Sequence, residues 1–395
     1  MPSEWINSYH QTNETEILDN DGVKIHDYIS CEQGAGVEVD KNTHPELWEK
    51  LGGGGYKEEG ILTASDAQAE DRFFVVSSYE GRLVVGAYGQ STAAIDAGKV
   101  YIYDWNGSSY TEVGQLTASD ASDGDFFGTS VSVYEDRLVV GASHESTAGY
   151  RKGKVYIYDW NGSQYIEVGT LTASDAINDD RFGKAVSVYE NRLVVGAYFR
   201  DTPDQNAGKV YIYDWNGSSY TEVSQLTASD GESFDYFGSS VSVYEDRLSV
   251  GAPTNDTVGS NAGKVYIYDW NGSQYVEVGT LTASDAINDD RFGSAVSVYE
   301  NRLVVGAPRQ GTAGKVYIYD WEVSQYIEVS QLIGSDVEED DRFGTSVHIN
   351  IYRLVVGVYE TENVYYYDDA SVVFVPDMPR VTGSPAPWQV IADAT

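Results

Sequence analysis

One segment of between 51 and 55 residues recurs along the chain, and this repetition restricts the fold more than any other feature. The string LTASD occurs five times and a variant, LIGSD, occurs once. Three further strings, FG, LVVGA and KVYIYDW, follow in the same order, with small departures in some copies. The LTASD-type strings begin at 62, 116, 171, 226, 281 and 332. The chain therefore contains six copies of one structural unit.

Within one copy, apolar residues alternate and are mostly β-branched or aromatic, which is typical of strands. The tight pair Glu135-Asp136 and the pair Asn161-Gly162 are hairpin signals in the second copy. The four strands of that copy are expected at 128–134, 137–142, 153–160 and 164–171. Each copy is therefore a predicted antiparallel meander, and six meanders predict an all-β, six-bladed β-propeller.

The ends of the repeat region predict how the ring closes. Residues 55–62 resemble the fourth strand of the other copies, whereas the last copy has no close counterpart after its third strand at 363–369. We therefore expect strand 55–62 to complete the last blade. Alternatively, residues 372–375 supply that strand and leave room for an irregular seventh blade. The predicted organisation is an attachment or capping segment at 1–54, a propeller at 55–375 and an extended, proline-broken tail at 376–395.

Charge and hydropathy exclude several partners. The chain has 25 Lys and Arg against 62 Asp and Glu, a formal net charge of −37, so we expect no nucleic-acid partner. No stretch approaches the ~20 apolar residues that span a bilayer, so membrane insertion is not expected. The first 20 residues lack the basic start and apolar run of a signal peptide. A virion or extracellular protein of this sequence would be released by another route, such as lysis.

The strings FGTSV, LVVGA and GKVYIY, placed after LTASD, resemble FG-GAP repeats, which occur in integrin alpha propellers and in many bacterial and viral surface proteins. The resemblance covers residues 55–369. It implies a propeller that binds or adheres. No HExxH, GxSxG or phosphate-loop pattern occurs in the chain, and the histidines share no repeated position. We therefore expect that the protein is not an enzyme.

Calcium is the one cofactor that the sequence raises. The DxDxDG calcium loop of integrin-type repeats is replaced here by a link such as YEDR, too short to wrap an ion. A pair of aspartates five residues apart precedes the first strand of each copy instead. One interpretation is an Asx turn at the first Asp and a cap or arginine partner at the second. The other is an oxygen-only calcium site in some blades, with candidate ligands Asp120, Asp123, Asp125, Asp175, Asp180, Asp230, Asp235, Asp285 and Asp290.

Aromatic residues also repeat on the third strand of each copy. Tyr101, Tyr103 and their equivalents are expected to fill the core. The tryptophans are expected to staple the outer hairpin or, alternatively, to offer sugar-stacking surfaces. They are Trp105, Trp160, Trp215, Trp270 and Trp321.

The loops between the second and third strands differ most between copies, and variable loops on a rigid scaffold usually carry recognition. The second and third of these loops bring positive or aromatic side chains to an acidic body. The predicted ligand-binding residues are Tyr150, Arg151, Lys152, Tyr198, Phe199 and Arg200.

Residues 28–53 resemble the collar domain of phage tail fibres. Together with the propeller, this predicts a virion component, of a phage tail or fibre, that contacts a host surface receptor or glycan. It would bind other virion proteins through 1–54 and 376–395. The alternatives are an exported bacterial surface adhesin that binds calcium, and a propeller enzyme that acts on polysaccharide.

Overall fold

The computed structural model describes residues 56–369, except for 67, 69, 203, 335, 336 and 352. Every regular element in this part of the chain is a β-strand, and the strands form six four-stranded sheets. Residues 60–366 make up one compact unit. The predicted attachment segment 1–54, the tail 376–395 and the alternative strand 372–375 lie outside the described residues.

Each sheet is one blade, and we number the blades 1 to 6 in chain order. Blade 1 comprises β2 (Phe73–Tyr79), β3 (Arg82–Ala87), β4 (Lys99–Trp105) and β5 (Tyr110–Leu116). Blade 2 comprises β6 (Phe127–Tyr134), β7 (Arg137–Ala142), β8 (Lys154–Trp160) and β9 (Tyr165–Leu171). Blade 3 comprises β10 (Ala185–Tyr189), β11 (Arg192–Ala197), β12 (Lys209–Trp215) and β13 (Tyr220–Leu226).

Blade 4 comprises β14 (Ser240–Tyr244), β15 (Arg247–Ala252), β16 (Lys264–Trp270) and β17 (Tyr275–Leu281). Blade 5 comprises β18 (Ala295–Tyr299), β19 (Arg302–Ala307), β20 (Lys315–Glu322) and β21 (Gln325–Leu332). Blade 6 comprises β22 (Phe343–Ile349), β23 (Arg353–Val358), β24 (Val364–Asp369) and β1 (Tyr56–Leu62). We call the strands of a blade a, b, c and d from the innermost to the outermost.

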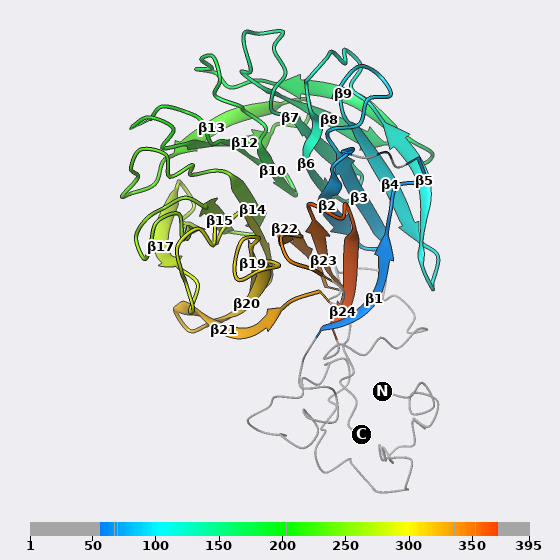
Figure 1. Ribbon diagram of the computed structural model, residues 1–395. Helices are drawn as coiled ribbons and strands as arrows, with labels where there is room; N and C mark the ends of the chain where they lie inside the picture. Colours follow the sequence, from blue (N-terminus) through cyan, green and yellow to red (C-terminus); the bar gives the residue numbers. More distant parts are fainter. Residues whose placement is uncertain are drawn as a thin grey trace, which may run out of the picture. The chain divides into compact units, whose positions relative to one another are not determined.

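The innermost strands close into a ring. Each strand a lies against strand a of the next blade, and β22 of blade 6 lies against β2 of blade 1 (Figure 1). The strand order β1-β24-β23-β22 places β1, from the start of the described chain, at the outer edge of blade 6. The predicted six blades and the predicted closure by an N-terminal strand are therefore confirmed.

The predicted strands of the second copy agree with β6 to β9 within one residue at each end. Glu135 opens the turn between strands a and b with a φ of 51°, and the equivalent Glu residues of the other hairpins share this conformation. The hairpin predicted at Asn161-Gly162 is confirmed, since β8 pairs with β9 through Trp160 and Tyr165. The loop there spans 161–164, because the Asn161 side chain accepts the N–H groups of Ser163 and Gln164 at 3.0 Å and so forms an Asx turn.

The core lies between neighbouring blades. Val84, Val100 and Ile102 of blade 1 pack with strands a to c of blade 2 in one buried cluster. Within blade 2, the Phe127 ring meets Tyr156 and Tyr158 edge-on, with centroids 5.3 and 6.3 Å apart. All three side chains are buried. The predicted core role of the strand c tyrosines is confirmed.

The strand c tryptophans link five of the six blades to the blade before them. The Arg82 guanidinium of blade 1 forms two hydrogen bonds with Asp104 and lies over the Trp160 ring of blade 2, 4.0 Å from its centroid. Trp160 also meets Tyr165 edge-on at 5.2 Å. The same arginine-over-tryptophan contact joins Arg137 to Trp215, Arg192 to Trp270, Arg247 to Trp321 and Arg353 to Trp105. The structure therefore favours the stapling interpretation over an open sugar-stacking surface.

A narrow channel of about 120 Å³ runs between the six innermost strands. In five blades a serine of strand a accepts a backbone N–H from strand a of the next blade, as Ser132 does from Val188 at 2.9 Å. At the seam between blades 6 and 1, His348 replaces this serine, and its Nε2 lies 2.6 Å from the carbonyl oxygen of Ser78. The ring is therefore closed by a hydrogen bond that the other interfaces lack.

The described residues include no helix that is long and apolar enough to cross a membrane.

Candidate ligand-binding face

Two kinds of loop emerge together on one face of the propeller, which we call the loop face. They are the b–c loops and the d–a loops, which join strand d of one blade to strand a of the next. Each b–c loop hydrogen-bonds to the following d–a loop, as where Phe182 N–H donates to the Lys152 carbonyl at 3.0 Å. The face is therefore a continuous set of connected loops.

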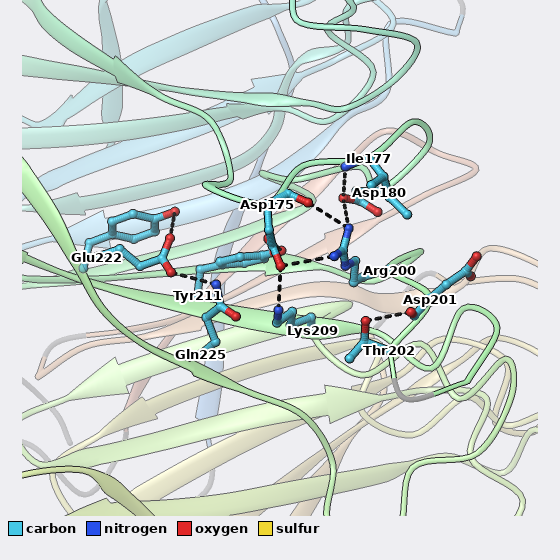
Figure 2. A network of polar contacts seen from close by, with 11 residues as sticks. Asp175, Ile177, Asp180, Arg200, Asp201, Thr202, Lys209, Tyr211, Glu222 and Gln225 are labelled. Carbon is cyan, nitrogen blue, oxygen red and sulfur yellow. Dashed lines mark hydrogen bonds and ion pairs between the residues drawn. The ribbon is translucent and has the colours of Figure 1, made fainter.

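The first Asp of each acidic pair joins the d–a loop to strand c. In blade 3, Asp175 accepts hydrogen bonds from Lys209 Nζ at 2.9 Å and from the Tyr211 hydroxyl at 2.6 Å (Figure 2). Partial burial opposes any lowering of the Asp175 pKa, but these hydrogen bonds outweigh it, and the pKa is lowered. The same pair of partners holds Asp66, Asp120, Asp230 and Asp285.

The second Asp is buried and closes its own loop. Asp125 accepts the backbone N–H of Ser122 at 2.7 Å, and Asp71, Asp180, Asp235, Asp290 and Asp341 accept the equivalent N–H. Burial raises the pKa of Asp125 to about 6, with a smaller contribution from the charge of Glu145. The predicted Asx turn at the first Asp is therefore corrected, because the first Asp binds lysine and tyrosine, whereas the second Asp caps the backbone of its loop. Arg181, one possible arginine partner of the second Asp, pairs with Asp179 instead.

These contacts bear on the candidate calcium ligands. Of the nine, Asp120, Asp175, Asp230 and Asp285 each bind a lysine ammonium, and Asp125, Asp180, Asp235 and Asp290 each bind a backbone N–H. Asp123 accepts the N–H of Ile95 at 3.0 Å. Within the described ranges, no three acidic, His or Cys side chains gather as metal ligands would. The residues present do not fit a calcium ion.

Arg200 has a different role from the predicted one. Its guanidinium binds Asp175 Oδ2 at 3.1 Å, Asp180 Oδ2 at 3.0 Å and the Asp175 carbonyl at 3.0 Å (Figure 2). The third residue after strand b is a buried polar side chain in blades 1, 2, 4 and 5 as well: Gln90, Glu145, Asn255 and Gln310. Arg200 therefore stabilises its own blade. Comparing this position between the copies could have predicted this role, because every one of these copies has a polar residue there.

A second set of residues on the loop face was missed. The residue before the FG phenylalanine varies between copies and has a φ between 57° and 63° in every blade. These pre-FG residues are Arg72, Phe126, Arg181, Tyr236, Arg291 and Arg342. Each precedes an innermost strand, so they surround the end of the channel. Their variation within an otherwise constant motif is the signal that could have identified them.

Arg181 brings the predicted binding residues of two loops together. Its backbone N–H donates to the Arg151 carbonyl at 3.1 Å, and its side chain donates to the Tyr198 hydroxyl at 2.6 Å. The Arg181 guanidinium also lies over the Phe199 ring at 3.8 Å, and Phe199 stacks on Tyr236 with 4° between the ring planes. Tyr198 and Phe199 are half-buried. This group of side chains is the Arg181 cluster.

The second loop adds an exposed part to the Arg181 cluster. Tyr150 is 56% exposed, the Arg151 guanidinium lies 5.0 Å from its ring centroid, and Lys152 is half-buried. Burial, together with the positive charges of Arg181 and Arg151, lowers the pKa of nearby His144 to about 3. An uncharged His144 therefore lies among cations at neutral pH.

Comparison with known proteins agrees with this geometry. The FG-GAP repeat model matches five segments that together exceed half of the chain: 56–103, 110–158, 165–213, 220–268 and 275–319. The chain belongs to the FG-GAP repeat family. It is 28% identical to integrin alpha-11 of Mus musculus over 243 residues, which cover 52% of this chain and 20% of the mouse protein. It is 30% identical to integrin alpha-11 of Homo sapiens over 211 residues, which cover 45% and 17%. The aligned part thus spans about a fifth of these curated relatives.

The packing explains why the FG-GAP motif needs its two glycines. A Cβ atom on Gly86 of blade 1 would collide with the carbonyl oxygen of Gly128 in blade 2. Gly128 itself has a φ of 88°, a conformation that L side chains rarely adopt. The two motif glycines therefore allow neighbouring FG-GAP blades to approach closely beneath the loop face.

Proposed function

We propose that this chain is a non-enzymatic adhesion propeller that binds a ligand on a cell surface through its loop face. The Arg181 cluster is the observation that carries the proposal. It gathers aromatic and positive side chains from two variable loops on a body with a net charge of −37. Such residues are typical of recognition surfaces, and variable loops on a rigid scaffold commonly provide them.

Two features favour binding over catalysis. The FG-GAP resemblance implies ligand-binding propellers, although fold by itself does not determine activity. The aspartates with raised pKa values, which could otherwise act as general acids, are buried and bound to backbone N–H groups of their own loops. A polysaccharide-acting enzyme is therefore the least supported of the three functions.

We further propose that the protein is a virion component, of a phage tail or fibre, found in the virion or outside the cell. The resemblance of residues 28–53 to a tail-fibre collar supports this. Residues 1–54 and 376–395 would bind other virion proteins, and the loop face would bind the host receptor or glycan. Mass spectrometry of purified particles tests this proposal, and absence of the protein from particles would contradict it.

An exported bacterial adhesin remains the second candidate. Such an adhesin would bind its ligand through the same loop face. Its calcium-binding form is less favoured, because the acidic pairs already bind lysine, tyrosine and backbone N–H groups.

The adhesion proposal can be tested with beads that carry the full chain and a panel of bacterial strains. In the test variant, residues 198–207 are replaced by the sequence of 308–313, which removes Tyr198 and Phe199. Gln310 occupies the same buried position as Arg200, so the exchange should preserve the blade. We expect fewer beads to be retained. The control is Val323→Gly, at a fully exposed turn on the opposite face with a φ of 57°. Equal loss in both variants, or no loss in the exchange, would contradict the proposal.

A further inference from the structure

The loop face has a second cationic region, which extends from blade 5 through blade 6 to Arg72 of blade 1, where the guanidinium lies over the Tyr88 and Phe126 rings at 5.1 and 5.7 Å. It comprises pre-FG residues of three successive blades, Arg291, Arg342 and Arg72, together with Arg309 from the b–c loop of blade 5. Within the described residues, no carboxylate forms an ion pair with the guanidinium of Arg72 or Arg291. Neither guanidinium is therefore neutralised by a carboxylate of the described residues.

Arg291 has an unmet hydrogen-bond requirement. Its Nε atom is buried and has no hydrogen-bond partner. Burial and the neighbouring charges of Arg309 and Arg342 lower its pKa. A buried donor without a partner loses the hydrogen bonds that water would supply, so native structures rarely keep one. The arrangement is one that an added negative charge would stabilise.

An open hollow of about 620 Å³ adjoins this region at the seam between blades 6 and 1. It is lined by Arg72, Arg342, Tyr359, Thr361 and three glutamates, Glu70, Glu360 and Glu362. The Arg342 guanidinium lies over the Tyr359 ring at 4.8 Å. The ion pair between Arg342 and Glu360 is long, 3.4 Å, and the two side chains are 36% and 46% exposed. A ligand could therefore displace Glu360 at little cost in free energy.

The composition of the hollow restricts its ligand. The arginines suit a carboxylate, while the exposed Glu70 and Glu360 would repel a second negative charge and can accept hydrogen bonds from hydroxyl groups. An acidic peptide segment supplies carboxylates but few hydroxyls. A polyanion would also be repelled by the net charge of −37. A sugar unit with one carboxylate and several hydroxyls satisfies both kinds of group.

We propose that this hollow binds a carboxylated sugar, of the uronic or sialic acid type, at the end of a glycan. Its carboxylate pairs with Arg72 and Arg342, and its hydroxyls donate to Glu70 and Glu360. Arg291 and Arg309 extend the positive side of the site toward blade 5. The inference rests on the proposed adhesive function and identifies the class of ligand.

The test is a saturation-transfer NMR titration of the full chain. The probes are the methyl glycosides of glucuronic acid and of N-acetylneuraminic acid, with methyl glucoside as the uncharged counterpart and an aspartate-containing tripeptide. We expect at least one acidic glycoside to bind, and methyl glucoside to bind about tenfold or more weakly, because a charged hydrogen-bond pair is lost. Which acidic glycoside binds more tightly distinguishes the two types of sugar.

Variants then place the site. The double variant Arg72→Gln and Arg342→Gln should weaken binding of the acidic glycoside about tenfold or more. Thr361→Trp, which fills the hollow from an exposed position, should weaken it to the same extent and serves as the test if the double variant does not fold. Val323→Gly, at the exposed turn on the opposite face, should leave binding unchanged. Failure of both acidic glycosides to bind, equal binding of methyl glucoside, tighter binding of the tripeptide, or insensitivity to both hollow variants would overturn the inference.

The two proposals fail in different ways. If the coated beads are retained by bacterial cells although neither acidic glycoside binds to the protein, the sugar inference is wrong and the adhesive function stands. If an acidic glycoside binds in the hollow but coated beads are not retained by any strain, the adhesive function is wrong and the sugar site stands.

Discussion

The Arg82 guanidinium of blade 1 lies 4.0 Å from the ring centroid of Trp160 in blade 2. Because Arg82 is also held by two hydrogen bonds to Asp104, it is a fixed surface on which the next blade packs. Four further pairs repeat the contact around the ring, so the interface between blades depends on it.

Replacing Trp160 with alanine should therefore weaken the interface between blades 1 and 2. A cation–π contact of this kind contributes about 0.5–2 kcal/mol, and loss of the half-buried ring adds to it, so we expect a destabilisation of about 2–3 kcal/mol. Urea unfolding measures this. Trp160→Phe should cost less, because an aromatic face remains. An unchanged unfolding midpoint for Trp160→Ala would show that the contact is incidental.

Replacing Asp120 or Asp125, the two aspartates of one loop, with asparagine should change the free energy of unfolding in opposite directions. The folded-state pKa of Asp125, about 6, lies above its unfolded value, so its charge destabilises the fold above pH 6 and this cost disappears as the pH falls through 6 toward 4. Asp125→Asn should raise stability by about 1–2 kcal/mol at pH 7.5 and change little at pH 3.5. The measurement is thermal unfolding at both pH values.

Asp120→Asn is the matched control. Burial tends to raise the pKa of Asp120, but the hydrogen bonds from Lys154 and Tyr156 outweigh it, and the pKa is lowered. The charged carboxylate of Asp120 therefore stabilises the fold above its unfolded-state pKa, and this stabilisation is lost as the pH falls through the folded-state pKa. The variant should lose about 0.5–1 kcal/mol at pH 7.5, a small amount because the ion pair is partly exposed. If both variants shift stability in the same direction, our assignment of the two roles is incorrect.

The seam between blades 6 and 1 should be sensitive to acid. Burial lowers the pKa of His348 to about 4, below its unfolded value of about 6.5, although the hydrogen bond to Ser78 acts the other way. The unfolded chain therefore binds the proton first, and stability should fall by up to about 3 kcal/mol as the pH drops from 6.5 to 4. His348→Gln keeps a donor for the Ser78 carbonyl without titrating. The difference between the two proteins in urea unfolding across this pH range should show the loss, and identical pH profiles would contradict it.

Calcium should not stabilise the described propeller. A lysine ammonium already neutralises the first Asp of the pair, and the second is bound to the loop backbone. We therefore expect no shift of the melting temperature when millimolar calcium is added to chelator-treated protein, and no binding heat by calorimetry. A calcium-dependent shift that Asp175→Asn abolishes would restore the calcium interpretation of these pairs.

Much of the fold could be predicted from the sequence because each repeat presents the same pattern. The ring closure was predictable because residues 55–62 match strand d, which β1 indeed supplies. The exact length of the hairpin loop at Asn161 was not, since an Asn-Gly pair fits a two-residue turn and the four-residue Asx loop equally well. Its length depends on how the Asn161 side chain hydrogen-bonds.

The candidate site was less predictable, because side-chain partners across blades decide it. Arg200 was expected to face a ligand, yet it binds Asp175 and Asp180 within its own blade. The position of Arg181 beside Tyr198 depends on how a d–a loop packs against the b–c loop of the blade that it enters, which no local pattern indicates. What was predictable is that Tyr198 and Phe199 lie in a variable loop of this face.

The most direct test of the central claim is the binding of the fluorescently labelled full chain to an array of neutral and acidic cell-surface glycans. The array is read for the wild type, the 198–207 exchange, the Arg72→Gln and Arg342→Gln double variant, and Val323→Gly. Our account predicts that the wild type binds a subset of the glycans, that at least one loop-face change removes this binding, and that Val323→Gly retains it. Binding that survives both loop-face changes, or that only Val323→Gly removes, would contradict the claim that the loop face is the binding surface.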